Sequence, residues 1–410
     1  MIRLLLKNTY FFSVLIFLSG MISCKSQIKE KEVGSSVKKS QIEQKEIIVG
    51  ANNTEAYFSL LKNKNVAVVA NQTSVIFKEG RSFTHLVDSL ISSGTNIKKV
   101  FSPEHGFRGK ADASEKVADS KDIKTGLPIV SLYGKNKKPS SEQLNDIDIV
   151  VFDIQDVGVR FYTYISTLHY IMEACAEAGI PVIVLDRPNP NGHYVDGPTL
   201  QIEHKSFVGM DPVPLVYGMT IGEYAQMING ENWLKDNLKC ELMIIPLQHY
   251  THDNSYSLTI RPSPNLPNDK AINLYPSLGF FEGTTINAGR GTEMQFQVYG
   301  APFFPKSNFT YTPKSNFGSK YPKHKDKLVN GVDLRRKGNL NMINLEWLLD
   351  AYSKTPKDQK FFGATFTVHA GIKELQTQVE NGLTQEQIKS TWQKDLDVFK
   401  KIRTKYLLYN

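Results

Sequence analysis

The chain has 410 residues, of which 40% are hydrophobic and 22% are charged. This composition excludes a largely disordered, collagen-like or coiled-coil protein, and the length predicts about two domains. The net charge of +8 is local, because residues 1–50 carry +4 and residues 301–340 carry +7, while the rest sums to −3. We therefore expect no continuous basic face and no nucleic-acid partner.

The first 24 residues have the layout of an export signal. Two basic residues precede an uncharged, largely apolar stretch that is too short to span a bilayer. The stretch ends in Ile-Ser-Cys24, which is similar to a bacterial lipobox, in which the cysteine is acylated. Residues 25–50 are polar and aperiodic, which is typical of a flexible tether. We expect an exported, membrane-anchored lipoprotein facing the periplasm or cell surface, held only by lipid on Cys24; the alternative is a plain secretory signal.

From residue 52 to about 250, short apolar runs alternate with helical patterns. The apolar runs are 66–70, 97–101, 128–132, 147–152, 181–185 and 242–245. The helical patterns lie around 54–63, 82–93, 163–178 and 220–236. This alternation predicts a parallel sheet that is covered by helices and buried on both faces.

Beyond residue 251 the sequence becomes rich in Pro, Gly, Asn and aromatic residues and has weak periodicity. Helical patterns at 345–352 and 384–406 then flank a strand that we predict at 364–370. We therefore predict an α/β fold with a Rossmann-like catalytic domain over 51–254. A smaller α+β domain over 255–410 is expected to complete the cleft.

Polar residues follow four of the apolar runs directly. These segments are Asn71 to Ser74, Ser102 to Gly109, Asp153 to Tyr162, and Asp186 to Gly192. In an open parallel sheet, ligands bind beyond the carboxyl ends of the strands. Any one segment could be turn chemistry alone, but four at one edge predict a shared active site.

The motifs that are missing narrow the reaction. The sequence has no GxSxG elbow, no phosphate loop, no HExxH helix, and no GxGxxG after its first strand. We expect no cofactor and no metal site. A metal held by His105, Asp153 and Asp156 stays open as an alternative, although these residues have no defined ligand spacing.

The remaining chemistry is that of carboxylates among amide and aromatic side chains, which suits a sugar. Glycoside cleavage needs an acid that protonates the leaving oxygen. We predict that Glu104 is this acid, because Phe101 and Phe107 could desolvate it, and we place His105 beside it in the catalytic set. The alternative is a structural carboxylate that caps a loop or pairs with Arg108.

The group that works with Glu104 has four candidates. They are Asp153, Asp156, Glu282 and the 2-acetamido oxygen of the substrate itself. We favour Asp156, because its loop follows the run 147–152, which could lie beside the strand that carries Glu104.

Several long motifs together resemble the exo-β-N-acetylmuramidase (NamZ-like) family. They are NQTS (71–74), SPEHGFRG (102–109), FDIQDVGVRFYTYIST (152–167), LDRPNPNG (185–192), VDGP (195–198), RPSPNLP (261–267), FEGTTINAGRGTE (281–293) and YGAP (299–302). They occur in order over nearly the whole mature chain. Where family members commonly have Pro before the Phe that follows the GRGT loop, this chain has Gln295 before Phe296.

The resemblance implies a glycosidase that releases N-acetylmuramic acid from the non-reducing end of peptidoglycan fragments during cell-wall turnover. Its partner would be a muropeptide or disaccharide, and Arg160 or Arg290 could bind the lactyl carboxylate of the sugar. The expected substrate-binding residues are Asn71, Asp153, Gln155, Arg160, Tyr162, Asp186, Arg187, Asn189, Asn265, Glu282, Asn287 and Arg290. A non-catalytic carbohydrate-binding lipoprotein and a metal-dependent cell-wall hydrolase remain alternatives.

Overall fold

The computed structural model describes residues 45–109 and 120–410 of the chain. The predicted leader with Cys24 and almost all of the tether lie outside the described residues. Lys45–Asn410 form one compact unit. Within the described residues, no helix combines the length and the apolar character that a membrane crossing needs.

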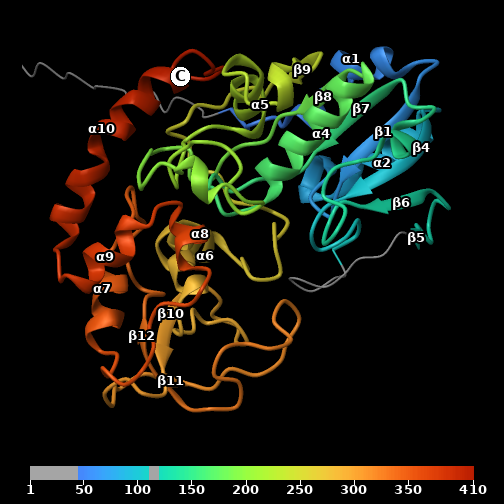
Figure 1. Cartoon of the computed structure of the whole chain (residues 1–410). Helices are drawn as coiled ribbons and strands as arrows, with labels where there is room; N and C mark the ends of the chain where they lie inside the picture. Colours follow the sequence, from blue (N-terminus) through green and yellow to red (C-terminus); the bar gives the residue numbers. More distant parts are fainter. Residues whose placement is uncertain (1–44, 110–119) are drawn as a thin grey trace, which may run out of the picture. The chain divides into compact units, whose positions relative to one another are not determined.

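A seven-stranded sheet forms the first half of the described chain (Figure 1). Its strands lie in the order β5-β6-β4-β1-β7-β8-β9, and all neighbours are parallel except the β5–β6 pair. Their bounds are β1 Asn65–Ala70, β4 Asn96–Ser102, β5 Ser120–Lys121, β6 Pro128–Ser131, β7 Ile149–Asp153, β8 Val182–Leu185 and β9 Leu242–Ile245. All six strands predicted between residues 52 and 250 are confirmed.

The central strands are apolar because both of their faces are covered. Successive side chains of a strand point to opposite faces. Val66 and Val68 of β1 therefore join one buried cluster, and Ala67 and Val69 join the other. Burial on both faces explains why these strands appear in the sequence as unbroken apolar runs.

Short helices and a hairpin connect these strands. They are α1 Thr54–Tyr57, β2 Val75–Phe77, β3 Phe83–His85, α2 Leu86–Ser92, α3 Ser141–Leu144, α4 Tyr164–Ala178 and α5 Ile221–Gly230. α5 begins at a capping box, in which Thr220 and Glu223 bond to each other's backbone N–H groups. The helix predicted at 82–93 begins only at Leu86, because the three residues before it form the hairpin strand β3.

The strand order places β1 between β4 and β7. The expectation that the strand before Asp156 lies beside the strand before Glu104 is therefore wrong. The chain first winds outward from β1 through β4 to β6 and then returns to β7 on the other side of β1. The switch point of the sheet thus lies between β1 and β7.

The second half of the chain holds a three-stranded antiparallel sheet and several helices (Figure 1). Their bounds are α6 Asp269–Leu278, β10 Val298–Ala301, β11 Thr310–Tyr311, β12 Val329–Asp333, α7 Glu346–Ser353, α8 Phe366–Ala370, α9 Glu374–Glu380 and α10 Gln385–Arg403. The strand predicted at 364–370 is wrong, because this segment forms α8. Phe366 is fully buried and Gly371 ends the helix in the left-handed conformation, so tertiary packing overrides the local strand preference.

The C-terminal helix α10 brings the end of the chain back to the first sheet (Figure 1). The Tyr409 hydroxyl donates to Asp186 at 2.6 Å, and the Arg403 guanidinium donates to the Gly218 carbonyl. One buried cluster contains side chains of both halves, for example Phe152 and Trp392. The domain boundary at 254/255 stays a prediction.

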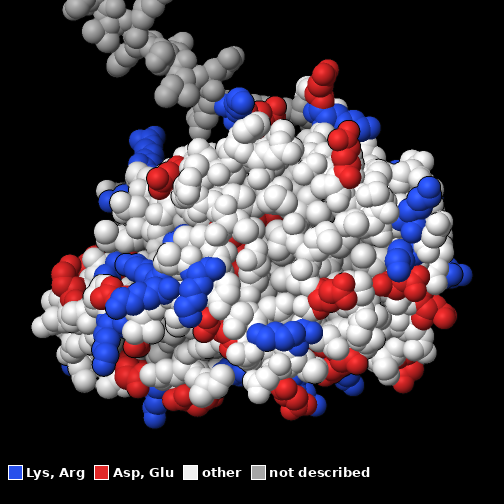
Figure 2. Space-filling view, turned by 90° about the horizontal axis from the view of Figure 1, so that it is seen from above, with Lys and Arg blue, Asp and Glu red and all other residues white. Residues whose placement is uncertain are grey.

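Charged side chains are scattered over the surface. On the face seen in Figure 2, basic and acidic side chains are interspersed and most of the surface is uncharged. Several basic residues are paired, as Arg335 is with Asp333 at 2.7 Å.

Candidate active site

The loop after β4 holds Glu104 in a tight turn. Gly106 donates its backbone N–H to the Pro103 carbonyl, and both His105 and Gly106 have positive φ, at 71° and 77°. A left-handed conformation at a non-glycine residue is uncommon, and such strain concentrates at functional sites. The turn presents the Glu104 side chain to a pocket while it buries His105.

Neighbouring groups hold this turn in place. The Thr163 hydroxyl donates to Glu104 Oε2 at 3.4 Å, and Ser263 Oγ lies 3.2 Å from His105 Nε2. Arg108 does not supply the ion pair considered for Glu104, since its guanidinium binds Asp88 at 3.1 Å and Asp122 at 2.7 Å. Arg108 therefore anchors the loop by binding two aspartates other than Glu104.

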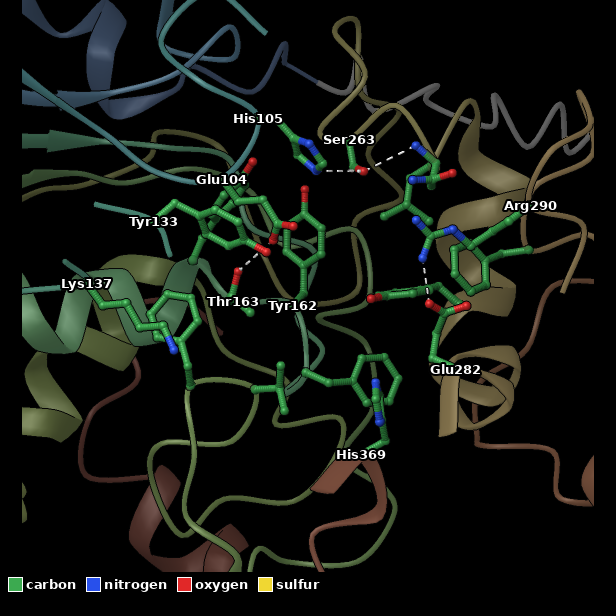
Figure 3. A pocket seen from close by; sticks show the side chains of 18 of the residues that line it. Glu104, His105, Tyr133, Lys137, Tyr162, Thr163, Ser263, Glu282, Arg290 and His369 are labelled. Carbon is green, nitrogen blue, oxygen red and sulfur yellow. Dashed lines mark hydrogen bonds and ion pairs between the residues drawn. The ribbon is translucent and has the colours of Figure 1, made fainter. Parts of the chain in front are cut away.

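Glu104 lies in a pocket of about 480 Å³, a volume typical of small-ligand sites (Figure 3). Six predicted residues line it: Glu104, His105, Tyr162, Asn265, Glu282 and Arg290. The other lining residues include Tyr133, Lys137, Phe161, Thr163, Tyr164, Phe207, Ser263, Tyr275, Phe296 and His369. The pocket thus draws on both halves of the chain.

Aromatic rings form a large part of the pocket wall. Tyr162 packs edge-on against Tyr164 with centroids 4.8 Å apart, and Tyr275 packs edge-on against Phe296 at 4.7 Å. The Tyr162 hydroxyl donates to the Pro262 carbonyl at 2.7 Å, which fixes its ring. Such a wall offers apolar faces to a sugar ring and polar edges to its hydroxyls.

The second half of the chain contributes an ion pair to the pocket. Arg290 Nη1 lies 2.6 Å from Glu282 Oε2. Burial by itself raises the pKa of Glu282, but the charges of Arg290 and Lys323 outweigh burial and hold this pKa below its usual value. The Asn287 side chain positions the segment by donating to the Arg290 and Lys323 carbonyls. Glu282 is therefore ionised at neutral pH.

Most predicted residues from the ends of β1, β7 and β8 lie outside the pocket lining and have internal partners. Arg187 binds both oxygens of Asp153, at 2.6 and 2.8 Å. Asp186 accepts hydrogen bonds from Thr220 and Tyr409. The amide groups behave alike: Asn71 Oδ1 accepts from Thr73, Gln155 donates to the Pro188 carbonyl, and Asn189 donates to the Met219 carbonyl.

Asp156 is likewise buried away from the pocket lining. The Tyr217 hydroxyl and the Gly158 N–H donate to its Oδ2, and Oδ1 has no hydrogen-bond partner among the described residues. Burial raises the pKa of Asp156 to about 7. Burial raises the pKa of Tyr162 and of Tyr275 in the aromatic wall, and the charge of Asp156 raises both pKa values further.

Arg160 fastens two distant segments together. Its guanidinium donates to the carbonyls of Pro198 and Val213 and, across the fold, to that of Ala370. Gly371 has a φ of 77°, and a Cβ there would meet Arg160 Nη2 at 2.3 Å. Arg160 is thus fully buried, and its guanidinium is bound to backbone oxygens instead of facing the pocket.

Sequence reasoning missed Tyr133 and Lys137, although the signal was available. Both follow β6, the third strand, whose carboxyl end lies at the same edge as those of β4 and β1. Applying the strand-end rule to this run would have found them. His369 was missed because its segment was taken for a strand.

The described residues contain no group of three or more His, Cys, Asp or Glu side chains that could hold a metal ion. His105 is directed to Ser263, and Asp153 is bound by Arg187. The three residues of the metal alternative are therefore not assembled as a ligand set.

The fold and pocket define a sugar-active enzyme architecture: a Rossmann-like sheet whose strand-end carboxylate faces an aromatic cleft. Family models described as exo-beta-N-acetylmuramidase NamZ, N-terminal and C-terminal, match residues 66–270 and 273–409. The chain therefore belongs to the NamZ exo-β-N-acetylmuramidase family, and it is a glycosidase.

Individual relatives agree with this assignment. The peptidoglycan beta-N-acetylmuramidase NamZ of Bacillus subtilis is 38% identical over 375 residues, which cover 86% of this chain and 89% of that protein. A crystal structure of a DUF1343 family protein from Bacteroides fragilis is 44% identical with a TM-score of 0.82, and a second one is 28% identical with a TM-score of 0.74. Each alignment covers 89% of this chain and 99% of the solved chain.

Proposed function

We propose that this protein hydrolyses the β-glycosidic bond of a terminal N-acetylmuramic acid at the non-reducing end of peptidoglycan fragments. The observation that carries the proposal is the position of Glu104, which faces an aromatic-walled pocket in the fold of this family. The peptidoglycan beta-N-acetylmuramidase activity of the Bacillus subtilis relative supports the same substrate class. Release of this sugar serves the turnover and recycling of the cell wall.

Glu104 acts as the general acid. The sugar ring packs on the aromatic wall around Tyr162 and Tyr275, with its glycosidic oxygen towards Glu104. The carboxyl proton passes to this oxygen as the bond to the anomeric carbon breaks, and water finally adds to that carbon. His105 supports the acid from the adjacent position of the turn, where Ser263 holds its ring.

The substrate's own acetamido oxygen supplies the second group. Among the described residues, Glu282 lines the pocket but is held by Arg290. Asp156 and Asp153 lie outside the pocket lining. The acetamido oxygen attacks the anomeric carbon as the glycosidic bond breaks. Water then displaces this oxygen from the same carbon while the Glu104 carboxylate takes up the proton of the water, so that two inversions retain the β configuration. NMR of the freshly released sugar checks this step: initial β-anomer is expected, and initial α-anomer would restore Asp156 as an inverting base.

The direct test of the function is incubation with the disaccharide of N-acetylmuramic acid β-linked to N-acetylglucosamine, followed by mass detection. The expected result is release of both monosaccharides in equal amounts. A disaccharide that binds but stays intact would favour a carbohydrate-binding lipoprotein. Loss of turnover with a chelator would favour the metal-dependent hydrolase.

The location of the protein is a separate proposal. We infer export and lipid anchoring at Cys24 from the apolar leader and the polar tether of the sequence. Cells supplied with a fatty-acid analogue should label the wild type and leave Cys24→Ala unlabelled. Equal labelling of both proteins would contradict lipidation.

A further inference from the structure

The loop after β6 carries two adjacent lysines with different surroundings. Lys138 Nζ lies 2.7 Å from Glu173 Oε1 and 2.7 Å from Glu177 Oε1, both on α4. Lys137 lines the pocket and, within residues 45–109 and 120–410, has no carboxylate within ion-pair distance. The two ion pairs of Lys138 tie this part of the loop to α4 and so restrict where Lys137 can lie.

An aromatic ring holds the Lys137 side chain against the pocket wall. Lys137 Nζ lies 4.6 Å from the centroid of the Phe207 ring, a cation–π distance. Phe207 in turn stacks on Tyr170 of α4, with centroids 6.3 Å apart and planes 13° apart. Packing therefore fixes the position of the ammonium group. Within the described residues, no carboxylate forms an ion pair with it.

The other basic residues considered for this pocket are already engaged. Arg290 is paired with Glu282 at 2.6 Å, and Arg160 is buried on backbone carbonyls. Figure 3 shows Lys137 on one side of the pocket and the Glu282–Arg290 pair on the other, with Glu104 and Tyr162 between them. Among the lysine and arginine residues that the structure describes in the pocket lining, Lys137 is therefore the one without a competing carboxylate for a substrate anion that enters beside Glu104.

We propose that Lys137 binds the lactyl carboxylate of the N-acetylmuramic acid and thereby selects this sugar over N-acetylglucosamine, which lacks the lactyl group. This inference rests on the proposed function and names its specificity residue. A charge-assisted hydrogen bond from an ammonium group to a carboxylate is among the stronger polar contacts at a binding site. Lys137 thus acts in binding, and Glu104 remains the group that acts on the bond.

The test compares two 4-nitrophenyl β-glycosides, that of N-acetylmuramic acid and that of its lactyl amide, which is neutral. Lys137→Gln should raise KM for the acid about 10-fold with kcat nearly unchanged, and should leave KM for the amide within about 2-fold. Lys137→Arg, which keeps the charge, should recover most of the affinity for the acid. Lys135→Gln is the matched control, because Lys135 is an exposed lysine of the same loop outside the pocket lining.

The results separate this inference from the proposed function. If the wild type releases nitrophenol from neither glycoside and leaves the disaccharide intact, the proposed function fails. If the wild type turns over the acid but Lys137→Gln raises KM equally for acid and amide, or for neither, only the role of Lys137 is overturned. An effect seen solely with a trisaccharide that carries a second muramic acid would move the carboxylate to the leaving group and also overturn the lactyl assignment.

Discussion

The loop after β4 and the loops after β7 and β8 look alike in sequence, yet they serve different purposes in the structure. All of them place carboxylates directly after a buried strand. Glu104 after β4 faces the pocket, whereas Asp153 at the end of β7 is bound by Arg187 and Asp186 after β8 is bound by Thr220 and Tyr409. A carboxylate near a strand end therefore faces the pocket in one case and is bound by buried groups in the others, and its partners distinguish the two.

The largest expected effect is on turnover by Glu104→Gln. General acid catalysis typically contributes about 10²–10⁴-fold, so kcat on the disaccharide should fall by that factor. The melting temperature should stay near that of the wild type, because Glu104 is only partly buried and its hydrogen bond to Thr163 is long, at 3.4 Å. Turnover within a few-fold of the wild type would remove Glu104 from the chemistry.

Arg187→Met should act on stability instead. It leaves Asp153 buried without its cation, and breaking a buried pair in this way costs about 3–5 kcal/mol of unfolding free energy. Urea unfolding measures this loss, and the double variant Asp153→Asn/Arg187→Met should recover part of it. If Arg187→Met lowers kcat of the folded protein about 100-fold while stability is kept, the ends of β7 and β8 belong to the catalytic machinery after all.

Asp156→Asn should show itself in the pH dependence of stability. Burial raises the pKa of the native Asp156 to about 7, above its ordinary value of 3.8. The folded protein therefore binds more protons than the unfolded chain between these values, and stability falls as pH rises through this window. Between pH 5 and pH 8, deprotonation of Asp156 should lower the unfolding free energy of the wild type by about 1–4 kcal/mol. Asp156→Asn should not show this loss.

Urea unfolding of both proteins at pH 5 and pH 8 provides the measurement. Asp186, whose pKa burial raises to about 6, titrates in both proteins and therefore cancels from the difference. Parallel pH dependence of the two proteins would show that Asp156 is not the buried acid described here. A loss of kcat comparable to that of Glu104→Gln would instead make it a catalytic base.

The sheet could be predicted from the sequence because its physical signal is local. Burial on both faces requires continuous apolar runs, and turn residues separate them. The segment 364–370 could not be predicted in this way, since its alternating Thr, Phe and Val favour a strand while burial of Phe366 and the left-handed Gly371 make it a helix. The order of the strands in the sheet could not be predicted either, because it depends on the path of the chain between strands.

The sequence predicts the edge of the sheet at which the site lies, but it does not predict which carboxylates at that edge line the pocket. The strand-end rule found Glu104, and the family motifs found Tyr162, Glu282 and Arg290, all of which line the pocket. Neither approach separates a carboxylate that meets the pocket from one that meets a buried arginine, as Asp153 does. That distinction depends on side-chain partners more than 30 residues apart, which one sequence does not reveal.

The most direct test of the account compares Glu104→Gln on two substrates that differ only in the leaving group. One is the disaccharide, whose leaving oxygen needs a proton, and the other is the 2,4-dinitrophenyl glycoside of N-acetylmuramic acid, whose phenolate leaves without one. If Glu104 is the general acid, the variant loses about 10²–10⁴-fold in kcat on the disaccharide but stays within about 10-fold of the wild type on the dinitrophenyl glycoside. An equal loss on both substrates would contradict the role of Glu104 as the acid.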